Sequence, residues 1–304
     1  EAEAIDFDLK KQGILHIYRD KVGFDHAGRV STLLAKGGLP RQAVTPEEMK
    51  AIEPTLAGQY YGGYFTESDS TGDIHKFCSG LALAAQRLGV RTLYGQDVTS
   101  VATDNQTATI QVSHSDAPPT VHTFDGVVVC AGVASKQFAT QLGDRVNIYP
   151  VKGYSITVNL NDSESQAGAP QVSLLDDETK LVTSRLGIDR FRVEGTAEFN
   201  GYNKDIRADR IKPLVDWVQQ CFPKINTRSV VSWAGLRPMM PNMMPKVGRG
   251  KASNVFYNTG HGHLGWTLSA VTADMVAETV RQQLTTIIQL PTPSSILEQI
   301  QFAK

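Results

Sequence analysis

Short apolar runs alternate along the chain with longer segments in which apolar residues recur every three or four positions. Ile14–Tyr18 and Gly62–Phe65 are short apolar runs and predict strands. Helical spacing over Asp25–Lys36 and over Thr267–Leu284 predicts two helices. Thr45-Pro46-Glu47-Glu48 has the form of a capping box, which predicts a further helix start.

The middle of the chain predicts a second group of elements. Asp73 is a good N-cap for a helix that Gly89 ends. Four short strand-like segments with polar hinges follow and predict a β-meander: Arg91–Tyr94, Val98–Ala102, Ala108–Val112 and Val121–Phe124. Val127–Cys130 is then wholly apolar and runs into Ala131-Gly132, which is typical of a parallel strand covered on both faces.

The third part of the chain predicts another sheet. Tyr154–Leu160 alternates apolar with polar residues, so we expect one of its faces to be wet. Lys180–Thr183 and Arg190–Gly195 predict neighbouring strands. Ile206–Cys221 is helical in pattern, with Pro213 tolerable near the start of a second helix.

These elements group into two interleaved regions, so the predicted fold class is α/β with two domains. Residues 72–150 and 230–285 form the α/β region, and residues 5–71 and 151–229 form a mixed or antiparallel sheet with flanking helices. Residues 286–304 make a C-terminal tail.

Composition and charge narrow the classes of function. With 304 residues and 41% hydrophobic content the chain can bury a large core. A net charge of −1 without a basic block argues against a nucleic-acid partner. No apolar run reaches the roughly 18–20 residues of a membrane span. Three widely spaced cysteines in apolar surroundings predict buried thiols and a reducing compartment. We therefore expect a cytoplasmic protein, at most peripheral to the inner membrane, without a metal site.

The strongest candidate for chemistry is Asn258–Thr267, which follows a predicted strand and opens a predicted helix. Three glycines in six residues let the backbone approach a flat or anionic ligand. The N–H groups and the positive end of the following helix would then face that ligand. The alternative is an ordinary strand-turn-helix junction.

A second candidate is the arginine in Trp233–Pro241. Arg237 stands between Gly235-Leu236 and Pro238 in an apolar stretch, which is a poor place for a solvated charge. A planar guanidinium suits a carboxylate, so Arg237 is predicted to bind one. A structural salt bridge is the alternative.

Together these segments resemble the FAD-dependent D-amino acid oxidase superfamily, in particular its bacterial D-amino acid dehydrogenase branch. The resemblance runs from near residue 5 to about residue 285. Its matching segments are Gly13-Ile14-Leu15, Thr71-Gly72-Asp73, Tyr149–Ser155, Gly195–Glu198, Gly235–Pro238 and Asn258–Thr267. It implies a Rossmann-like FAD-binding domain interleaved with a substrate domain.

The resemblance also assigns roles to residues. Arg237 would grip the substrate α-carboxylate, and Tyr154 and Arg192 would contact the substrate from the sheet that roofs it. Val98 would clamp the adenine of FAD through its backbone. The other residues implied at the cofactor are Ala131, Gly132, Gly235, Pro238, Gly260, His261, Gly262, His263, Leu264, Gly265, Trp266 and Thr267, together with Arg237.

The implied activity is FAD-dependent oxidative deamination of an amino acid, by hydride transfer from Cα to flavin N5. In this branch the substrate is a D-amino acid and the electrons pass to a quinone or another acceptor. An oxygen-using oxidase of glycine, sarcosine or another secondary amine is the alternative enzyme. A non-catalytic subunit that keeps the fold is the alternative outside enzymes.

One departure from the family pattern concerns the diphosphate of FAD. Such enzymes open with a strand, a G-x-G-x-x-G turn and a helix, with an acidic residue about 20 positions on. No such unit opens this chain within Glu1–Gly38. We therefore expect that unit on a separate N-terminal fragment or companion subunit.

Overall fold

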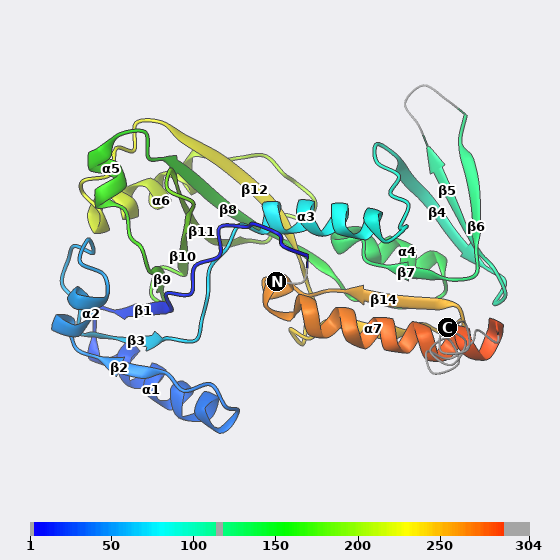
Figure 1. Ribbon diagram of the computed structural model, residues 1–304, viewed down its shortest axis with the longest axis horizontal. Coiled ribbons are helices and arrows are strands. Elements are labelled where there is room, and N and C mark those ends of the chain that lie inside the picture. The colour runs from blue at the N-terminus through cyan, green and yellow to red at the C-terminus, as the bar shows by residue number, and fades with distance from the viewer. Residues whose placement is uncertain (1–2, 114–117, 289–304) are drawn as a thin grey trace, which may run out of the picture. The chain divides into compact units, whose positions relative to one another are not determined.

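Two compact units make up the computed structural model, which describes residues 3–113 and 118–288 (Figure 1). The first unit contains Glu1–Thr92, Lys152–Phe199 and Asn203–Gly235. The second contains Leu93–Val151, Asn200–Tyr202 and Leu236–Lys304. Each unit is therefore built from separated stretches of the chain.

The first unit is organised around an eight-stranded sheet in the order β12-β8-β11-β10-β9-β1-β3-β2. From β8 to β2 the neighbouring strands are antiparallel, except β9 and β1, which are parallel. The strands are β1 (Ile14–Tyr18), β2 (Gln42–Val44), β3 (Gly62–Thr66), β8 (Tyr149–Asn159), β9 (Ser173–Asp176), β10 (Leu181–Leu186), β11 (Arg190–Glu198) and β12 (Val230–Met239). The predicted mixed sheet is confirmed.

Five helices accompany this sheet: α1 (Lys21–Lys36), α2 (Pro46–Ile52), α3 (Ile74–Arg87), α5 (Ser163–Gly168) and α6 (Ala208–Cys221). Helix α6 buries Leu214, Trp217 and Val218, which recur at helical spacing and belong to the same core as Ile156 and Phe191 of the sheet. The predicted capping box at Thr45 is present and starts α2. Asp73 caps α3 as predicted.

The second unit contains two three-stranded sheets, β13-β14-β7 and β4-β5-β6. Strands β14 and β7 are parallel, and β13 is antiparallel to β14. The elements are β4 (Asp97–Thr103), β5 (Ala108–Ser113), β6 (Thr120–Phe124), β7 (Val127–Val129), η1 (Gly132–Ala134), α4 (Ser135–Gln141), β13 (Lys246–Arg249), β14 (Val255–Thr259) and α7 (Gly265–Ile288). Its core includes Phe138, Ile148 and Tyr257.

Several expectations about these elements are wrong. Within Tyr154–Leu160 the expected wet face is limited to Thr157 and Asn159, which are partly exposed, because Ser155 is buried. Pro213 lies inside the single helix α6 rather than at the start of a second one. Arg91–Tyr94 forms no strand, so the meander has three strands.

The exposure of the thiols also differs from expectation. Cys221 is buried, but Cys78 and Cys130 are exposed. The structure places residues 72–92 and 230–235 in the first unit, whereas the sequence pattern grouped them with the second. Of the predicted tail 286–304, residues 289–304 lie outside the described part of the chain.

A search of the described helices for a segment long and apolar enough to cross a membrane finds none.

Candidate functional site

The glycine-rich segment predicted to hold a flavin connects strand β14 to helix α7. Gly260 and Gly262 have φ values of +78° and +59°, a backbone region that residues with a Cβ rarely adopt. A Cβ on Gly260 would lie 2.7 Å from Met240 Cγ, and a Cβ on Gly262 would lie 2.6 Å from Met239 Sδ. The loop therefore needs both glycines, for conformation and for space.

Backbone contacts join this glycine loop, residues 260–264, to the end of β12. The Gly262 N–H donates to the Pro238 carbonyl oxygen at 3.0 Å. Met239 and His261 form an antiparallel bridge. Arg237 directly precedes Pro238, and its side chain is partly buried. The structure thus brings together the two strongest features of the sequence, the predicted carboxylate-binding arginine and the predicted flavin loop.

The spacing of Gly260, Gly262 and Gly265 is also that of a dinucleotide-binding turn, G-x-G-x-x-G between a strand and a helix. In such a turn the backbone approaches a diphosphate, which binds at the helix N-terminus. Here the Gly262 N–H is already donated to Pro238. The hydrogen bonding favours a loop closed against β12 over one that cradles a diphosphate.

The end of β7 borders the same edge of the sheet. Val129 pairs in parallel register with Tyr257, so Ala131 and Gly132 follow β7 where Thr259 ends β14. Gly132 has a φ of +54°, and among the described residues, its chain neighbours aside, no atom lies within 4 Å of the place where its Cβ would be. Open space at the carboxyl ends of parallel strands is where α/β sheets bind cofactors.

Three observations support the prediction of a flavin at this edge. Space is open before Gly132. The Oδ1 atom of Asn258 is buried and finds no partner among the described residues. Helix α7 begins at Gly265 and directs its positive end toward the loop. A flavin gains negative charge when reduced, which such a helix end stabilises.

The remaining predicted cofactor residues are placed as follows. His263, Leu264, Trp266 and Thr267 are exposed around the start of α7. Gly235 lies partly buried in β12. Val98 lies in β4, where the pairing with β5 is irregular, and the β4-β5-β6 sheet shares no strand with β13-β14-β7. The roles of these residues stay predictions.

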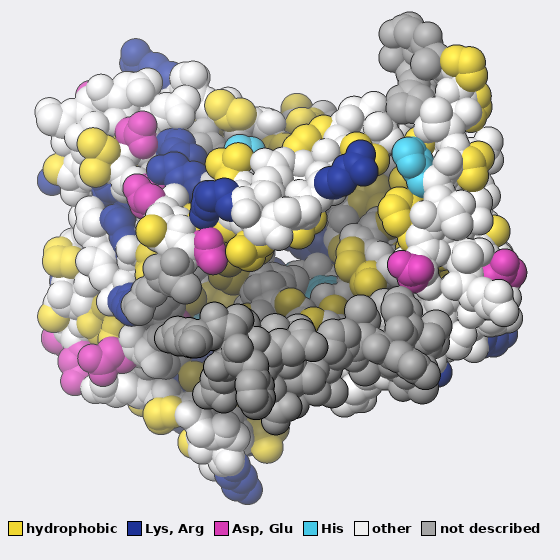
Figure 2. All heavy atoms as spheres, turned by 45° about the vertical axis from the view of Figure 1, so that its right-hand side comes forward, with side chains coloured by type: hydrophobic (Ala, Val, Ile, Leu, Met, Phe, Trp, Pro, Cys, Tyr) yellow, Lys and Arg dark blue, Asp and Glu magenta, His cyan; other side chains and the backbone are white. Residues whose placement is uncertain are grey.

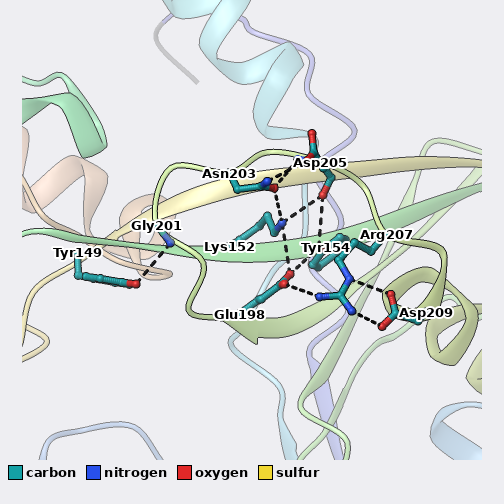
Figure 3. A network of polar contacts seen from close by, with 9 residues as sticks. All are labelled: Tyr149, Lys152, Tyr154, Glu198, Gly201, Asn203, Asp205, Arg207 and Asp209. Atoms are coloured by element: carbon teal, nitrogen blue, oxygen red, sulfur yellow. Dashed lines mark hydrogen bonds and ion pairs between the residues drawn. The ribbon is translucent and has the colours of Figure 1, made fainter.

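Tyr154, the predicted substrate contact, lies in a buried polar network (Figure 3). Its hydroxyl donates to Glu198 Oε2 at 2.5 Å. The Lys152 ammonium, also fully buried, lies 3.4 Å from the same carboxylate. It donates to Asn203 Oδ1 and to the Asp205 carbonyl oxygen, both at 3.1 Å. The network joins β8 to the end of β11 and to the loop before α6.

The network stabilises the charged forms of Lys152 and Glu198. Hydrogen bonding to Tyr154 and to Glu198 raises the pKa of the Lys152 ammonium. Hydrogen bonds from Tyr154 and Lys152 lower the pKa of the Glu198 carboxyl. Arg207 contacts Glu198 as well, at 3.2 Å. In this arrangement the Tyr154 hydroxyl is engaged with protein groups, so its contact with a substrate stays a prediction.

Lys152 is a member of the network for which the sequence alone predicted no role. A lysine between apolar residues in a strand predicts a buried charge that needs a partner, which is the signal that could have found it. Its partner Glu198 lies beyond an irregularity in β11 between Gly195 and Glu198. Thr196 has a φ of +66° within that irregularity.

Arg192, the other predicted substrate contact, lies on β11. Its guanidinium carbon is 5.4 Å from the centre of the Trp233 ring, and its Nε is 3.6 Å from Glu194 Oε2. The side chain of Arg192 is 31% exposed. Stacking on an exposed tryptophan holds the arginine in place, and a substrate contact stays a prediction.

The chain matches the family model described as FAD dependent oxidoreductase over residues 1–279. It belongs to that family, whose cofactor is FAD. It is 56% identical to D-amino acid dehydrogenase 3 of Mesorhizobium japonicum, over 93% of this chain and 68% of that protein. It is 39% identical to a D-amino acid dehydrogenase of Dechloromonas aromatica, over 92% of this chain and 67% of that protein. The chain thus spans about two thirds of the length of these relatives.

Solved structures share the fold. Glycine oxidase from Geobacillus kaustophilus superposes with a TM-score of 0.82 at 21% identity, over 91% of this chain and 73% of that one. L-proline dehydrogenase from P. horikoshii gives a TM-score of 0.78 at 18% identity, over 91% of this chain and 74% of that one. At such identities the likeness shows the fold alone.

Replacing the buried ammonium tests the network. Lys152→Met leaves the Glu198 carboxylate without one of its buried partners, so we expect a lower melting temperature. Lys212→Met is the matched control, because Lys212 makes an exposed ion pair with Asp216. Because the pKa of Glu198 is lowered, the advantage of the native protein over Lys152→Met should be present at neutral pH and shrink as the pH falls through that pKa. Equal melting temperatures for the two variants at neutral pH would contradict the account.

Proposed function

We propose that this protein carries out the oxidative deamination of a D-amino acid. FAD, when bound, would supply the hydride acceptor, its N5 atom, for the hydrogen on the substrate Cα. The substrate loses that hydride and an amine proton, and the resulting imino acid hydrolyses to a 2-oxo acid and ammonia. The protein supplies binding, orientation and electrostatics.

The observation that carries this proposal is the connection between Arg237 and the glycine loop. The Gly262 N–H donates to Pro238, the residue after the arginine. Arg237 would bind the substrate carboxylate through its side chain. The backbone next to Arg237 is hydrogen-bonded to the predicted flavin loop, so the bound carboxylate would have a defined position relative to that loop. Such positioning can lower a barrier by several kcal/mol.

Lys152, the lysine of the buried network, is not assigned as a general base in this proposal. The Lys152 ammonium has Asn203, Asp205 and Glu198 as partners, so its three N–H groups all have acceptors nearby. Its raised pKa keeps it protonated. Removal of a proton from the substrate amine is not needed if the amine binds in its neutral form, and we assign no general base.

The stereochemistry of the substrate is proposed from the relatives. The two named relatives at 56% and 39% identity are both called D-amino acid dehydrogenases. The structures of glycine oxidase and L-proline dehydrogenase share no more than 21% identity with this chain and support the fold only. We therefore favour a D-amino acid over glycine or a secondary amine.

We also infer that a polypeptide segment outside these 304 residues supplies the diphosphate-binding unit. The two D-amino acid dehydrogenases named above are longer than this chain, which matches 68% and 67% of their lengths. In the described part of the chain β7 has β14 as its single strand neighbour, and Val128 on it is 40% exposed. Val271 and Met275, one turn apart on α7, are 52% and 53% exposed. Parallel sheets and their helices are normally covered.

Hydrophobic side chains are exposed elsewhere in the second unit. Val121 and Phe124 of β6 are 62% and 46% exposed, on the three-stranded sheet at the upper right of Figure 2. A strand added in parallel to β7, followed by a helix, would bring a diphosphate-binding turn to the edge where Gly132 leaves open space.

Removing the guanidinium of Arg237, the predicted partner of the substrate carboxylate, tests the proposed reaction. Arg237→Ala should lower kcat/KM for D-amino acids by about 100-fold or more, because orientation of the substrate is lost, while FAD stays bound. Arg281→Ala is the control, since that arginine pairs with Glu278 on the exposed side of α7. Loss of the flavin from Arg237→Ala, with its absorption spectrum, would show that Arg237 holds the cofactor instead.

The electron acceptor is tested by reoxidation. We propose that the reduced protein passes electrons to a quinone, so reduction of a soluble quinone should outpace peroxide formation in air. Stopped-flow absorbance of the substrate-reduced protein, mixed with either acceptor, measures both rates. Rapid peroxide formation would instead identify an oxygen-using oxidase.

Introducing a charge on α7 tests whether the proposed diphosphate-binding segment packs against this helix. Val271→Glu should reduce the FAD content of the purified full-length protein or complex several-fold, because a carboxylate is costly in a buried apolar contact. Leu33→Glu is the matched control, on the exposed side of α1, where Leu33 is 67% exposed. FAD content unchanged by Val271→Glu would contradict docking on this helix.

A further inference from the structure

The imidazole of His261 reaches away from the glycine loop and into the helix that follows it. Its Nε2 atom lies 3.1 Å from the Oγ1 atom of Thr272, two turns into α7. Thr272 is 4% exposed, so the contact is largely shielded from water. His261 itself is partly buried, and burial lowers its pKa.

The hydrogen bonding of Thr272 determines which atom is the donor. A threonine hydroxyl carries a single hydrogen. Oγ1 of Thr272 lies 2.9 Å from the carbonyl oxygen of Leu268 and 3.4 Å from that of Ser269. Both are acceptors only, so the hydroxyl donates to the helix backbone. The hydroxyl oxygen must then accept from His261, which places a hydrogen on Nε2.

The loop is thus held from two sides. Its backbone is tied to β12 by the Gly262 N–H donated to Pro238 and by the bridge between Met239 and His261. The side chain of His261 is hydrogen-bonded to α7 through Thr272. A loop with two left-handed glycines has high conformational freedom when unfolded, so such ties are what hold it in one conformation.

We propose that His261 is a positioning residue, which fixes the glycine loop for the flavin by donating its Nε2 hydrogen to Thr272. The inference rests on the proposed function in one respect, that this loop is the flavin's binding loop. It changes the role that the family resemblance gave to His261. The imidazole edge carrying Nε2 is engaged with α7, so the proposal leaves contact with the cofactor to the loop backbone.

Two substitutions at Thr272 separate this role from simple packing. Thr272→Val keeps the size and branching of the side chain but removes the acceptor. Thr272→Ser keeps the hydroxyl. In the full-length protein or complex we expect Thr272→Val to weaken FAD binding about 5- to 10-fold, the effect of one lost hydrogen bond. Thr272→Ser should bind FAD as the native protein does.

A double-mutant cycle with His261→Ala completes the binding test. FAD affinity, measured by quenching of flavin fluorescence, should fall in each single variant and no further in the double variant, because both remove one interaction. Losses that add, or a Thr272→Val protein that binds FAD as the native one does, would overturn the proposal. A Thr272→Ser variant as weak as Thr272→Val would also overturn it.

A spectroscopic readout does not depend on turnover. Nitrogen-15 chemical shifts of the imidazole distinguish a protonated Nε2 from a protonated Nδ1. For His261 in the native protein at neutral pH we expect a protonated Nε2, with a signal that changes in Thr272→Val. A neutral ring protonated at Nδ1 alone would overturn the proposal. If FAD binds and the tautomer is as expected but no amino acid reduces the flavin, the proposed reaction fails and the positioning role stands.

Discussion

The hydrogen bond from the Gly262 N–H to the Pro238 carbonyl oxygen is the contact on which the candidate site depends. It joins two segments that lie far apart in the sequence, the end of β12 and the turn between β14 and α7. Gly262 can make it because its φ of +59° turns the backbone toward β12, with Met239 in the space that a side chain would fill. Backbone contacts therefore join the segment that carries Arg237 to the predicted flavin loop.

A second constraint acts in the eight-stranded sheet, where an ammonium is fully buried. Lys152 can remain charged there because Glu198, Asn203 and Asp205 surround it with acceptors. The irregularity in β11 between Gly195 and Glu198 is what allows that carboxylate to meet β8. The polar groups of the network thus join the loop between β11 and α6 to strand β8.

The features that could be predicted from the sequence are local ones. The capping box at Thr45 and the turn at Gly260–Gly262 depend on a few adjacent residues, and the structure contains both. Strand β12 was missed because Gly235 and Pro238 interrupt a strand pattern. The network around Lys152 could not be predicted, since its partners are some fifty residues away and meet it only after β11 pairs with β8. The match to the FAD dependent oxidoreductase family confirms the class that the glycine loop and Arg237 indicated.

The most direct test of the central claim is anaerobic mixing of the FAD-loaded full-length protein with single amino acid enantiomers. The visible absorption band of the oxidised flavin reports hydride transfer without any electron acceptor. We expect D-alanine and other D-amino acids to bleach this band within one turnover, and L-enantiomers to leave it unchanged. A flavin that is bound but stays oxidised with every D-amino acid would contradict the account.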